Sequence, residues 1–287
     1  MLAAVATTAL AQNRLGIILI GDAGEPGGIL DSNARLMEEW SRPERNGGAD
    51  VGLLFFLGDN FYPIGLNNDS ATNQRLIEEC LSPHQRLLAQ LGRNNVHAMA
   101  GNHDYYCNML GPAPYGACIQ GNRRESEIAE WSYHYRYPSL VRRATQQGGS
   151  DSVDVIIFDS ALLLNQRQET WREALDSLEQ LLRASAAAPG VRWRIITAHH
   201  SPYSVGEHAG YRRWSERQGA VVHFGNCWED GVDPTKYVQQ LVSNEDNCTP
   251  HYRAYSDSLG AVIARSGARI HAMIAGHDHS LQLLNSP

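Results

Sequence analysis

Short apolar runs recur along the chain, and each one stops at a glycine or a polar residue. The runs are rich in β-branched residues and too short for typical helices, which favours buried strands. The six predicted strands span residues 15–20, 51–57, 96–100, 153–158, 191–198 and 270–275.

Helical patterns lie between these strands. Strands that alternate with helices predict an α/β protein with largely parallel or mixed sheets whose faces are covered. Asp31 is expected to cap the first helix, and Pro83 interrupts the second pattern. The predicted helices span residues 31–40, 70–91, 169–186 and 256–266.

Two stretches are expected to leave this core. Residues 105–149 are dense in Tyr, Pro and Gly, and residues 211–255 lack a clear core period. The second stretch is expected to form either a flap over the site or a solvated surface insertion. We therefore predict one domain over residues 15–287 with insertions near 105–149 and 211–255.

The predicted strands end in residue types that bind metal ions. In open α/β sheets the functional crevice lies outside the carboxyl ends of the strands, so these side chains are expected to converge. A single Gly-Asp or His-x-His motif indicates little, because such residues commonly form turns or pack in cores. Their joint occurrence, in order, predicts a metal centre built from Asp22, Asp59, Tyr62, Asn102, His200, His277 and His279.

The chemistry of these donors fits two metal ions that act on a phosphate ester. Two cations roughly 3.5–4 Å apart provide hydroxide at neutral or acidic pH and offset the charge of the transition state. Asp59 is the natural candidate for a carboxylate that bridges them. Mixed oxygen and imidazole donors suit iron, manganese or zinc.

Composition limits the partners of this chain. The formal net charge of -7 argues against a dedicated nucleic-acid binder, which normally carries a basic patch. A phosphate substrate is compatible with this charge, because bound cations invert the local field. No stretch of the sequence approaches the about 20 apolar residues that a membrane span needs.

The N-terminus and the cysteines favour export. Residues 1–14 are apolar and rich in small residues, so they are either the remnant of a signal peptide or a frayed N-terminus. Two cysteine pairs flank loop-like stretches, as in disulfides of an oxidising compartment; five reduced thiols in a cytosolic protein are the alternative. The pairs are Cys107 with Cys118 and Cys227 with Cys248, and Cys80 is left over. We expect a secreted, periplasmic or extracellular protein.

Taken together, the motifs resemble the ordered set of the purple acid phosphatases, within the metallophosphoesterase superfamily. They are GDAG at 21–24, GDNFY at 58–62, GNHD at 101–104, AHHSP at 198–202 and GHDH at 276–279. The full GDNFYPIG stretch and the pair Glu207 and His208 are similar to the small, tartrate-resistant type. The resemblance covers residues 15–284 apart from the insertions. It implies a sandwich of two mixed β-sheets flanked by helices, with the metal site at the carboxyl ends of the strands.

The resemblance also implies the role of each ligand. It assigns a ferric ion to Asp22, Tyr62 and His279, a divalent iron, zinc or manganese ion to Asn102, His200 and His277, and the bridge between them to Asp59. Tyr62 is the discriminating residue, because a phenolate is a hard, anionic donor that favours Fe(III). A packing role for this tyrosine is the alternative.

Three further residues are expected near the phosphate. His103 and His208 resemble the family's histidines that contact the phosphate and protonate the leaving group, which an imidazole can do because its ordinary pKa lies near the working pH. A solvated loop position is the alternative for His208. Asp104 is expected to orient His103 through a hydrogen bond. Adjacent strand residues point to opposite faces, so His199 is expected to face the core or to lie behind the metal ligands.

These patterns predict an acid phosphatase that hydrolyses small phosphomonoesters or phosphoproteins by attack of a metal-bound hydroxide. The alternatives are a general metallophosphoesterase or phosphodiesterase with two divalent metals, and a non-catalytic metal-binding homologue. The sequence does not predict an oligomeric state. The chain ends at Pro287, soon after His279, where the family normally has further sheet-forming chain. A natural short form and a truncated chain both agree with this end.

Overall fold

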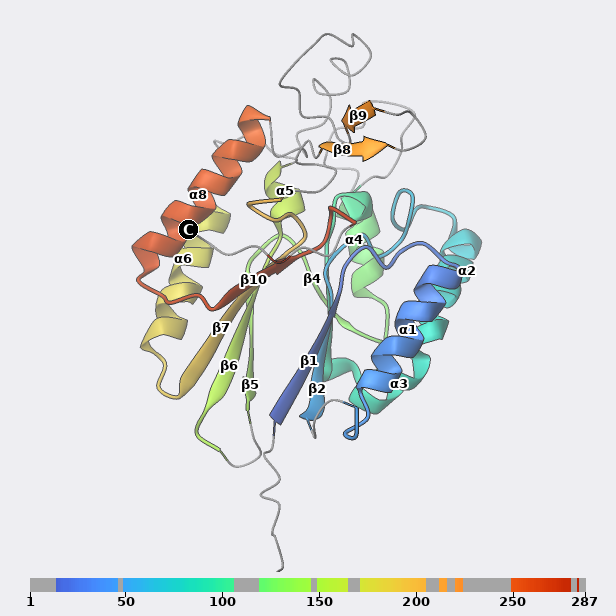
Figure 1. Cartoon of the computed structure of the whole chain (residues 1–287), viewed down its shortest axis with the longest axis horizontal. Helices are drawn as coiled ribbons and strands as arrows, with labels where there is room; N and C mark the ends of the chain where they lie inside the picture. Colours follow the sequence, from blue (N-terminus) through green and yellow to red (C-terminus); the bar gives the residue numbers. More distant parts are fainter. Residues whose placement is uncertain are drawn as a thin grey trace, which may run out of the picture.

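The computed structural model describes residues 14–45, 49–105, 119–145, 149–164, 171–204, 212–215, 220–223, 249–279 and 283. Two four-stranded sheets form its centre (Figure 1). The first sheet is parallel, in the order β1 (Arg14–Ile20), β2 (Ala49–Phe56), β3 (Val96–Met99) and β4 (Ser132–His134). The second has the order β10 (Ala272–Ala275), β7 (Val191–Ala198), β6 (Ser152–Phe158) and β5 (Ser139–Ala144), and β5 runs antiparallel to β6.

The predicted α/β sandwich of two sheets is confirmed, and the six apolar runs form β1, β2, β3, β6, β7 and β10. Only the second sheet is mixed. The expectation that residues 105–149 leave the core is wrong for β4 and β5, which are the last strands of the two sheets. Their sequences, SYH and SLVRRA, carry little of the apolar signal because sheet-edge strands are partly solvated.

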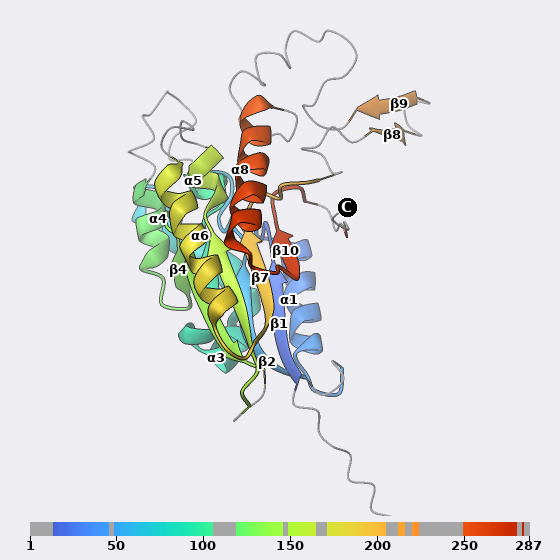
Figure 2. The same cartoon turned by 90° about the vertical axis from the view of Figure 1, so that its left-hand side faces the viewer.

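Helices cover the outer faces of both sheets. Figure 1 shows α1 and α3 beside the first sheet, and Figure 2 shows α6 and α8 over the second. The helices are α1 (Gly28–Trp40), α2 (Ser70–Leu81), α3 (Gln85–Leu91), α4 (Ile119–Ser126), α5 (Ser160–Leu164), α6 (Arg172–Ala187) and α8 (Pro250–Ser266). Three short 3-10 helices, η1 (Ser82–His84), η2 (Arg93–Asn95) and η3 (His103–Tyr105), and a separate pair of strands, β8 (Arg212–Ser215) and β9 (Ala220–His223), complete the described elements.

Three helix starts differ from the predictions, and α6 begins at Arg172 and not at residue 169. The first helix begins at Gly28, so Asp31 lies in its first turn and not at its cap. The last helix begins at Pro250, where the Thr249 hydroxyl accepts a hydrogen bond from the Tyr252 amide at 3.2 Å. A threonine cap followed by proline is a normal helix start, so the second insertion ends before this residue and not at 255. The break predicted at Pro83 is confirmed, since η1 separates α2 from α3.

The core has three apolar layers. One lies between the first sheet and α1–α3, with Phe56 and Leu88 among its members. Another lies between the second sheet and α6 and α8, and includes Phe158 and Leu178. The middle layer, which includes Phe55, joins the inner faces of the two sheets. This stack fixes both sheets, so the loops at their carboxyl ends project from a rigid base.

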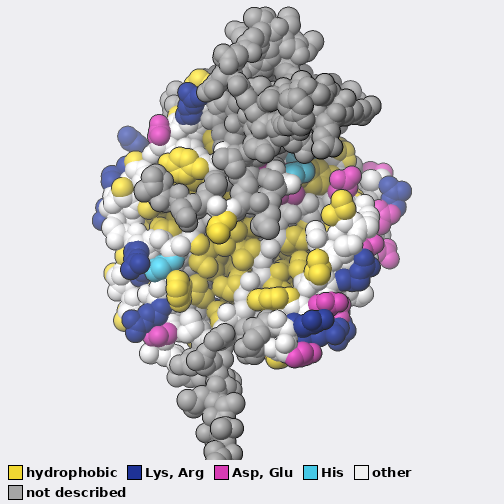
Figure 3. Space-filling model, in the orientation of Figure 1, with side chains coloured by type: hydrophobic (Ala, Val, Ile, Leu, Met, Phe, Trp, Pro, Cys, Tyr) yellow, Lys and Arg dark blue, Asp and Glu magenta, His cyan; other side chains and the backbone are white. Residues whose placement is uncertain are grey.

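Apolar side chains also gather where the two sheets meet the surface. Figure 3 shows them on the face between α1 and α8, where Figure 1 places β1 and β10. Across the described ranges, no helix combines the length and the apolar character needed to cross a membrane. Cys80 is buried, with its thiol 3.4 Å from the Gly24 carbonyl oxygen. The four cysteines expected to pair lie outside the described residues.

Two histidines, His84 and His97, are buried in this core, and His134 is half-buried beside His97. Burial lowers the pKa of His84, His97 and His134 to about 4. The His84 ring packs against Phe56, and within the described residues neither of its ring nitrogens has a hydrogen-bond partner. These side chains are therefore neutral in the folded protein at neutral pH.

Replacing His84 with leucine is expected to make stability less sensitive to acid. The folded-state pKa of about 4 lies below the ordinary value of 6.5, so the unfolded chain binds more protons between these two pH values. The contribution of the neutral ring to the free energy of unfolding is complete above pH 6.5. It falls by about 2–3 kcal/mol for each such histidine as the pH drops towards 4. Urea unfolding at pH 7.5 and 4.5 measures this loss, and an equal loss in wild type and His84→Leu would contradict neutral burial of this ring.

Candidate metal centre

The loops that follow the strands hold four predicted ligands in a rare backbone conformation. The φ angles are 57° for Asp22, 54° for Asp59, 72° for His277 and 47° for His279. Residues other than glycine seldom adopt this left-handed region, and each instance costs about 1–3 kcal/mol unless the surroundings fix it. The turns after β1, β2 and β10 are therefore set by tertiary packing.

Glycines let these loops approach one another. A Cβ atom at Gly101 would lie 2.2 Å from the Asp59 Oδ1, and one at Gly21 would lie 2.8 Å from the Gly276 Cα. Either side chain would push the loops apart. The loop after β2 thus packs directly on the loop after β3, and the loop after β1 packs on the loop after β10.

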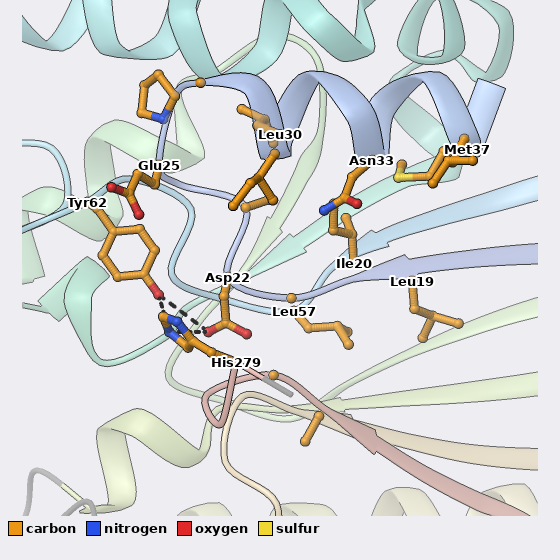
Figure 4. A pocket seen from close by; sticks show the side chains of 18 of the residues that line it. Leu19, Ile20, Asp22, Glu25, Leu30, Asn33, Met37, Leu57, Tyr62 and His279 are labelled. Atoms are coloured by element: carbon orange, nitrogen blue, oxygen red, sulfur yellow. Dashed lines mark hydrogen bonds and ion pairs between the residues drawn. The ribbon is translucent and has the colours of Figure 1, made fainter. Parts of the chain in front are cut away.

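Tyr62 joins a first group of donors at one end of a cavity of about 840 Å³ beside α1 (Figure 4). Its hydroxyl lies 2.9 Å from Asp59 Oδ2, 3.4 Å from Asp22 Oδ1 and 3.0 Å from His279 Nε2. Figure 4 shows the side chains of Asp22, Tyr62 and His279 turned toward one another. The structure therefore brings together the residues that the resemblance assigns to a ferric ion and its bridge.

A second group of donors lies beside the first. The Asn102 Oδ1 is 2.8 Å from His199 Nε2 and 3.3 Å from His277 Nδ1. The rings of His200 and His277 have centroids 4.2 Å apart. One nitrogen from each of His199, His200 and His277 lies within 4.8 Å of the others, and all three side chains are buried. The structure thus also brings together the three predicted ligands of the divalent ion.

Asp59 connects the two groups. Its Oδ2 accepts a hydrogen bond from Tyr62 and lies 3.4 Å from His199 Nε2. Its Oδ1 accepts a hydrogen bond of 2.9 Å from the backbone amide of His103. This carboxylate therefore lies between the two groups of donors.

His199 is buried directly behind the predicted ligands Asp59 and Asn102, in agreement with the sequence prediction. Its Nδ1 lies 2.8 Å from the Leu57 carbonyl oxygen, and its Nε2 faces the Asn102 oxygen and the Asp59 carboxylate. Since all of these partners are acceptors, both ring nitrogens must donate, which requires the imidazolium form. Burial lowers the pKa of a histidine, but the Asp59 carboxylate outweighs it and raises the pKa of His199 to about 10. In the protein without metal, this side chain is the counter-ion of Asp59.

Protonation elsewhere in the site depends on the same charges. Burial favours the neutral form of Asp59, but His199 outweighs it and holds the pKa of this carboxyl well below its usual range. Burial raises the pKa of Asp22, although His199 opposes the effect. Burial and then the two carboxylates raise the pKa of Tyr62 far above its ordinary value. Two carboxylates, a phenol, an amide and four imidazoles in two adjacent groups fit two cations, which would favour the phenolate and carboxylate forms.

The structure describes two of the three residues predicted to lie near the phosphate. His103 lies at the edge of the site, with its Nδ1 2.6 Å from the Pro63 carbonyl oxygen and its Nε2 3.9 Å from Asp59 Oδ2. Asp104 acts elsewhere than predicted: its carboxylate accepts hydrogen bonds from Asn60 and from the backbone amide of Gly101. The chain reverses in the short η3 helix, which turns this carboxylate inward. His208 lies outside the described residues.

Residues that the sequence did not single out support His200. The Ser160 Oγ lies 3.1 Å from His200 Nδ1 and accepts a hydrogen bond of 2.9 Å from its backbone amide. The Tyr255 hydroxyl donates to the His200 carbonyl oxygen at 3.0 Å. Ser160 follows the end of β6, and that position at a strand end was the signal that could have identified it.

The chain is similar to several known proteins. A sequence model of the calcineurin-like phosphoesterase family matches residues 15–281. The chain belongs to this family. Purple acid phosphatase 17 of Arabidopsis thaliana is 22% identical over 269 residues, which cover 91% of this chain and 70% of that protein. A solved structure, GAP50, the anchor in the inner membrane complex of Plasmodium, is 14% identical with a TM-score of 0.47; the match covers 66% of this chain and 56% of that one, about half its length.

Membership of the calcineurin-like phosphoesterases makes the chain a phosphoester hydrolase of the metallophosphoesterase superfamily, whose members bind divalent metals. The predicted superfamily is therefore confirmed, and the purple acid phosphatase relative agrees with the motif resemblance. The donors described above lie within the matched residues.

Replacing Asp59 with asparagine is expected to abolish binding of both metal ions. An amide oxygen carries no charge, and its NH2 group would face the donors of both groups. Metal content per chain after reconstitution with iron and zinc measures the loss. Asp176→Asn, an exposed acid on α6, is the control and should keep the wild-type content. Full occupancy in Asp59→Asn would contradict a shared role for this carboxylate.

Proposed function

We propose that this calcineurin-like phosphoesterase is an acid phosphatase of the purple type, which hydrolyses phosphomonoesters at an Fe(III)–M(II) centre. The observation that carries the proposal is the Tyr62 hydroxyl, which lies within 3.4 Å of oxygen or nitrogen atoms of Asp22, Asp59 and His279. A phenolate among two carboxylates and an imidazole is a hard, anionic donor set that favours a trivalent ion. The 22% identical purple acid phosphatase 17 supports the same proposal.

The residues divide between two cations. Asp22, Tyr62 and His279 would hold the ferric ion, Asn102, His200 and His277 would hold divalent iron, zinc or manganese, and Asp59 would contact both. When bound, such ions lower the pKa of water and offset the negative charge of a phosphoryl group. Asn102 and His277 are already in contact, and their burial excludes water from the inner side of the centre.

His103 is placed for proton transfer to the leaving group. Its Nδ1 donates to the Pro63 carbonyl oxygen, which fixes the ring, and its Nε2 points toward the centre. The ring also packs on Tyr62 with centroids 4.5 Å apart. A half-exposed imidazole at this edge can hold a proton at Nε2 and donate it to the departing alkoxide oxygen.

Replacing Tyr62 with phenylalanine is expected to remove the visible absorption of the iron-loaded protein. The broad band of a purple acid phosphatase comes from tyrosinate-to-Fe(III) charge transfer, and phenylalanine has no oxygen to bind the ion. Absorption spectra of wild type and Tyr62→Phe test this, with the exposed Tyr137→Phe as the control that keeps the band. A colourless wild type that carries manganese or zinc would favour a general metallophosphoesterase instead.

Replacing His103 with alanine is expected to lower kcat for para-nitrophenyl phosphate by about 100-fold or more, the usual contribution of a positioned acid. Metal content should stay at the wild-type level, because this residue contacts the ligands from outside. His271→Gln, at the other end of β10 from His277, is the control with unchanged kcat. Wild-type kcat in His103→Ala would exclude the proposed proton transfer, and an inactive wild type with full metal content would exclude the phosphatase.

A further inference from the structure

A buried polar cluster lies beneath the two loops that carry Asp59 and Asn102. The Asn60 amide nitrogen Nδ2 is 2.8 Å from the Met99 carbonyl oxygen, 3.1 Å from Asp104 Oδ2 and 3.1 Å from Glu125 Oε2. Asn60 is 4% exposed, Asp104 is 1% exposed and Glu125 is fully buried. Three acceptors from three parts of the chain therefore converge on one amide group.

This cluster is joined to both ligand loops through the backbone. The Asp104 carboxylate accepts a hydrogen bond of 2.9 Å from the amide of Asn60, the residue after Asp59. It accepts another of 2.8 Å from the amide of Gly101, the residue before Asn102. Any shift of Asp104 or of the Asn60 side chain would therefore move a ligand of each group.

Glu125 reaches the cluster from α4, 65 residues away from Asn60. Its helix is held in place by the Trp131 indole, which donates to the Glu125 carbonyl oxygen at 2.9 Å, and by Asn122, whose amide lies 3.3 Å from the Asp104 carbonyl oxygen. Placing a carboxyl group here costs free energy, because burial and the neighbouring Asp104 carboxylate both disfavour its charged form. An apolar side chain of similar size often packs in such a position at no cost to stability, so packing alone does not explain this residue.

We propose that Glu125 is a positioning residue for the metal ligands. It fixes the Asn60 side chain, and with Asp104 it holds Asp59 and Asn102 in the orientation that binds cations. Groups that orient metal ligands from behind are commonly as necessary as the ligands themselves. This role rests on the metal centre of the proposed function.

Zinc binding by the full chain, freed of metal with a chelator, tests the role without relying on activity. Isothermal titration with Zn²⁺ should give Glu125→Leu a Kd raised about 10- to 100-fold over wild type, the usual effect of losing such a partner. Glu125→Gln should bind within about threefold of wild type, because its amide oxygen accepts the same hydrogen bond from Asn60.

A control separates positioning from loss of stability. Leu87→Val shortens a buried side chain of α3 in the apolar layer that also contains Trp131. It should lower the unfolding midpoint of the metal-free protein and leave the Zn²⁺ Kd at the wild-type value. If Glu125→Leu does not fold, Glu125→Asp decides, because it keeps the acid and withdraws it from Asn60 by one methylene. This variant should also bind Zn²⁺ more weakly.

The outcomes separate the two proposals. If wild type binds Zn²⁺ and Glu125→Leu has the same Kd, the positioning role is overturned and the metal centre is left intact. Where the leucine variant is unfolded, an unchanged Kd in Glu125→Asp has the same meaning. A wild type that does not bind Zn²⁺ would overturn the metal centre, and the role of Glu125 with it. Weaker binding in these variants, with rescue by Glu125→Gln and none of the effect in Leu87→Val, supports the role.

Discussion

The Asp59 carboxylate carries a negative charge with almost no access to water, and the surrounding loops are arranged to satisfy it. This residue is 1% exposed, and a buried carboxylate is tolerated only when it is paired or hydrogen-bonded. Its partners are the Tyr62 hydroxyl, the His103 amide and the His199 imidazole. Gly101 approaches so closely that a Cβ would overlap the carboxylate. One side chain thus fixes the ends of β2, β3 and β7 relative to one another.

The same constraint couples metal binding to protonation and stability. Without cations, the His199 imidazolium is the counter-ion of Asp59 and the Tyr62 hydroxyl donates a hydrogen bond to the same carboxylate. Cations that bind here must displace such protons, so metal affinity depends on pH. The strained backbone at Asp22, Asp59, His277 and His279 is held by packing before any ion arrives. Ions that bind the folded protein and not the unfolded chain then add stability.

The folded chain loses stability in acid. His84 and His97 are buried and His134 is half-buried, all three in the neutral form, and they favour unfolding as they become protonated in the unfolded chain. Metal ions bound to the folded chain would offset part of this loss of stability. The polar cluster of Asn60 and Glu125 also lies where apolar side chains could pack, and its hydrogen bonds fix the ligand loops instead.

The sequence by itself determined the six buried strands and the donors at their ends, because apolar periodicity reports which local faces are buried and parallel strands bring their carboxyl ends together. Only the tertiary structure decided where polar edge strands such as β5 join, since their burial depends on a neighbour and not on their own pattern. It also decided the partners of buried polar groups. Asp104 contacts Asn60 from 44 residues away, and His199 contacts Asn102 from 97 residues away. Local sequence carries no signal for these contacts, because hydrogen-bond geometry is set by how distant loops pack.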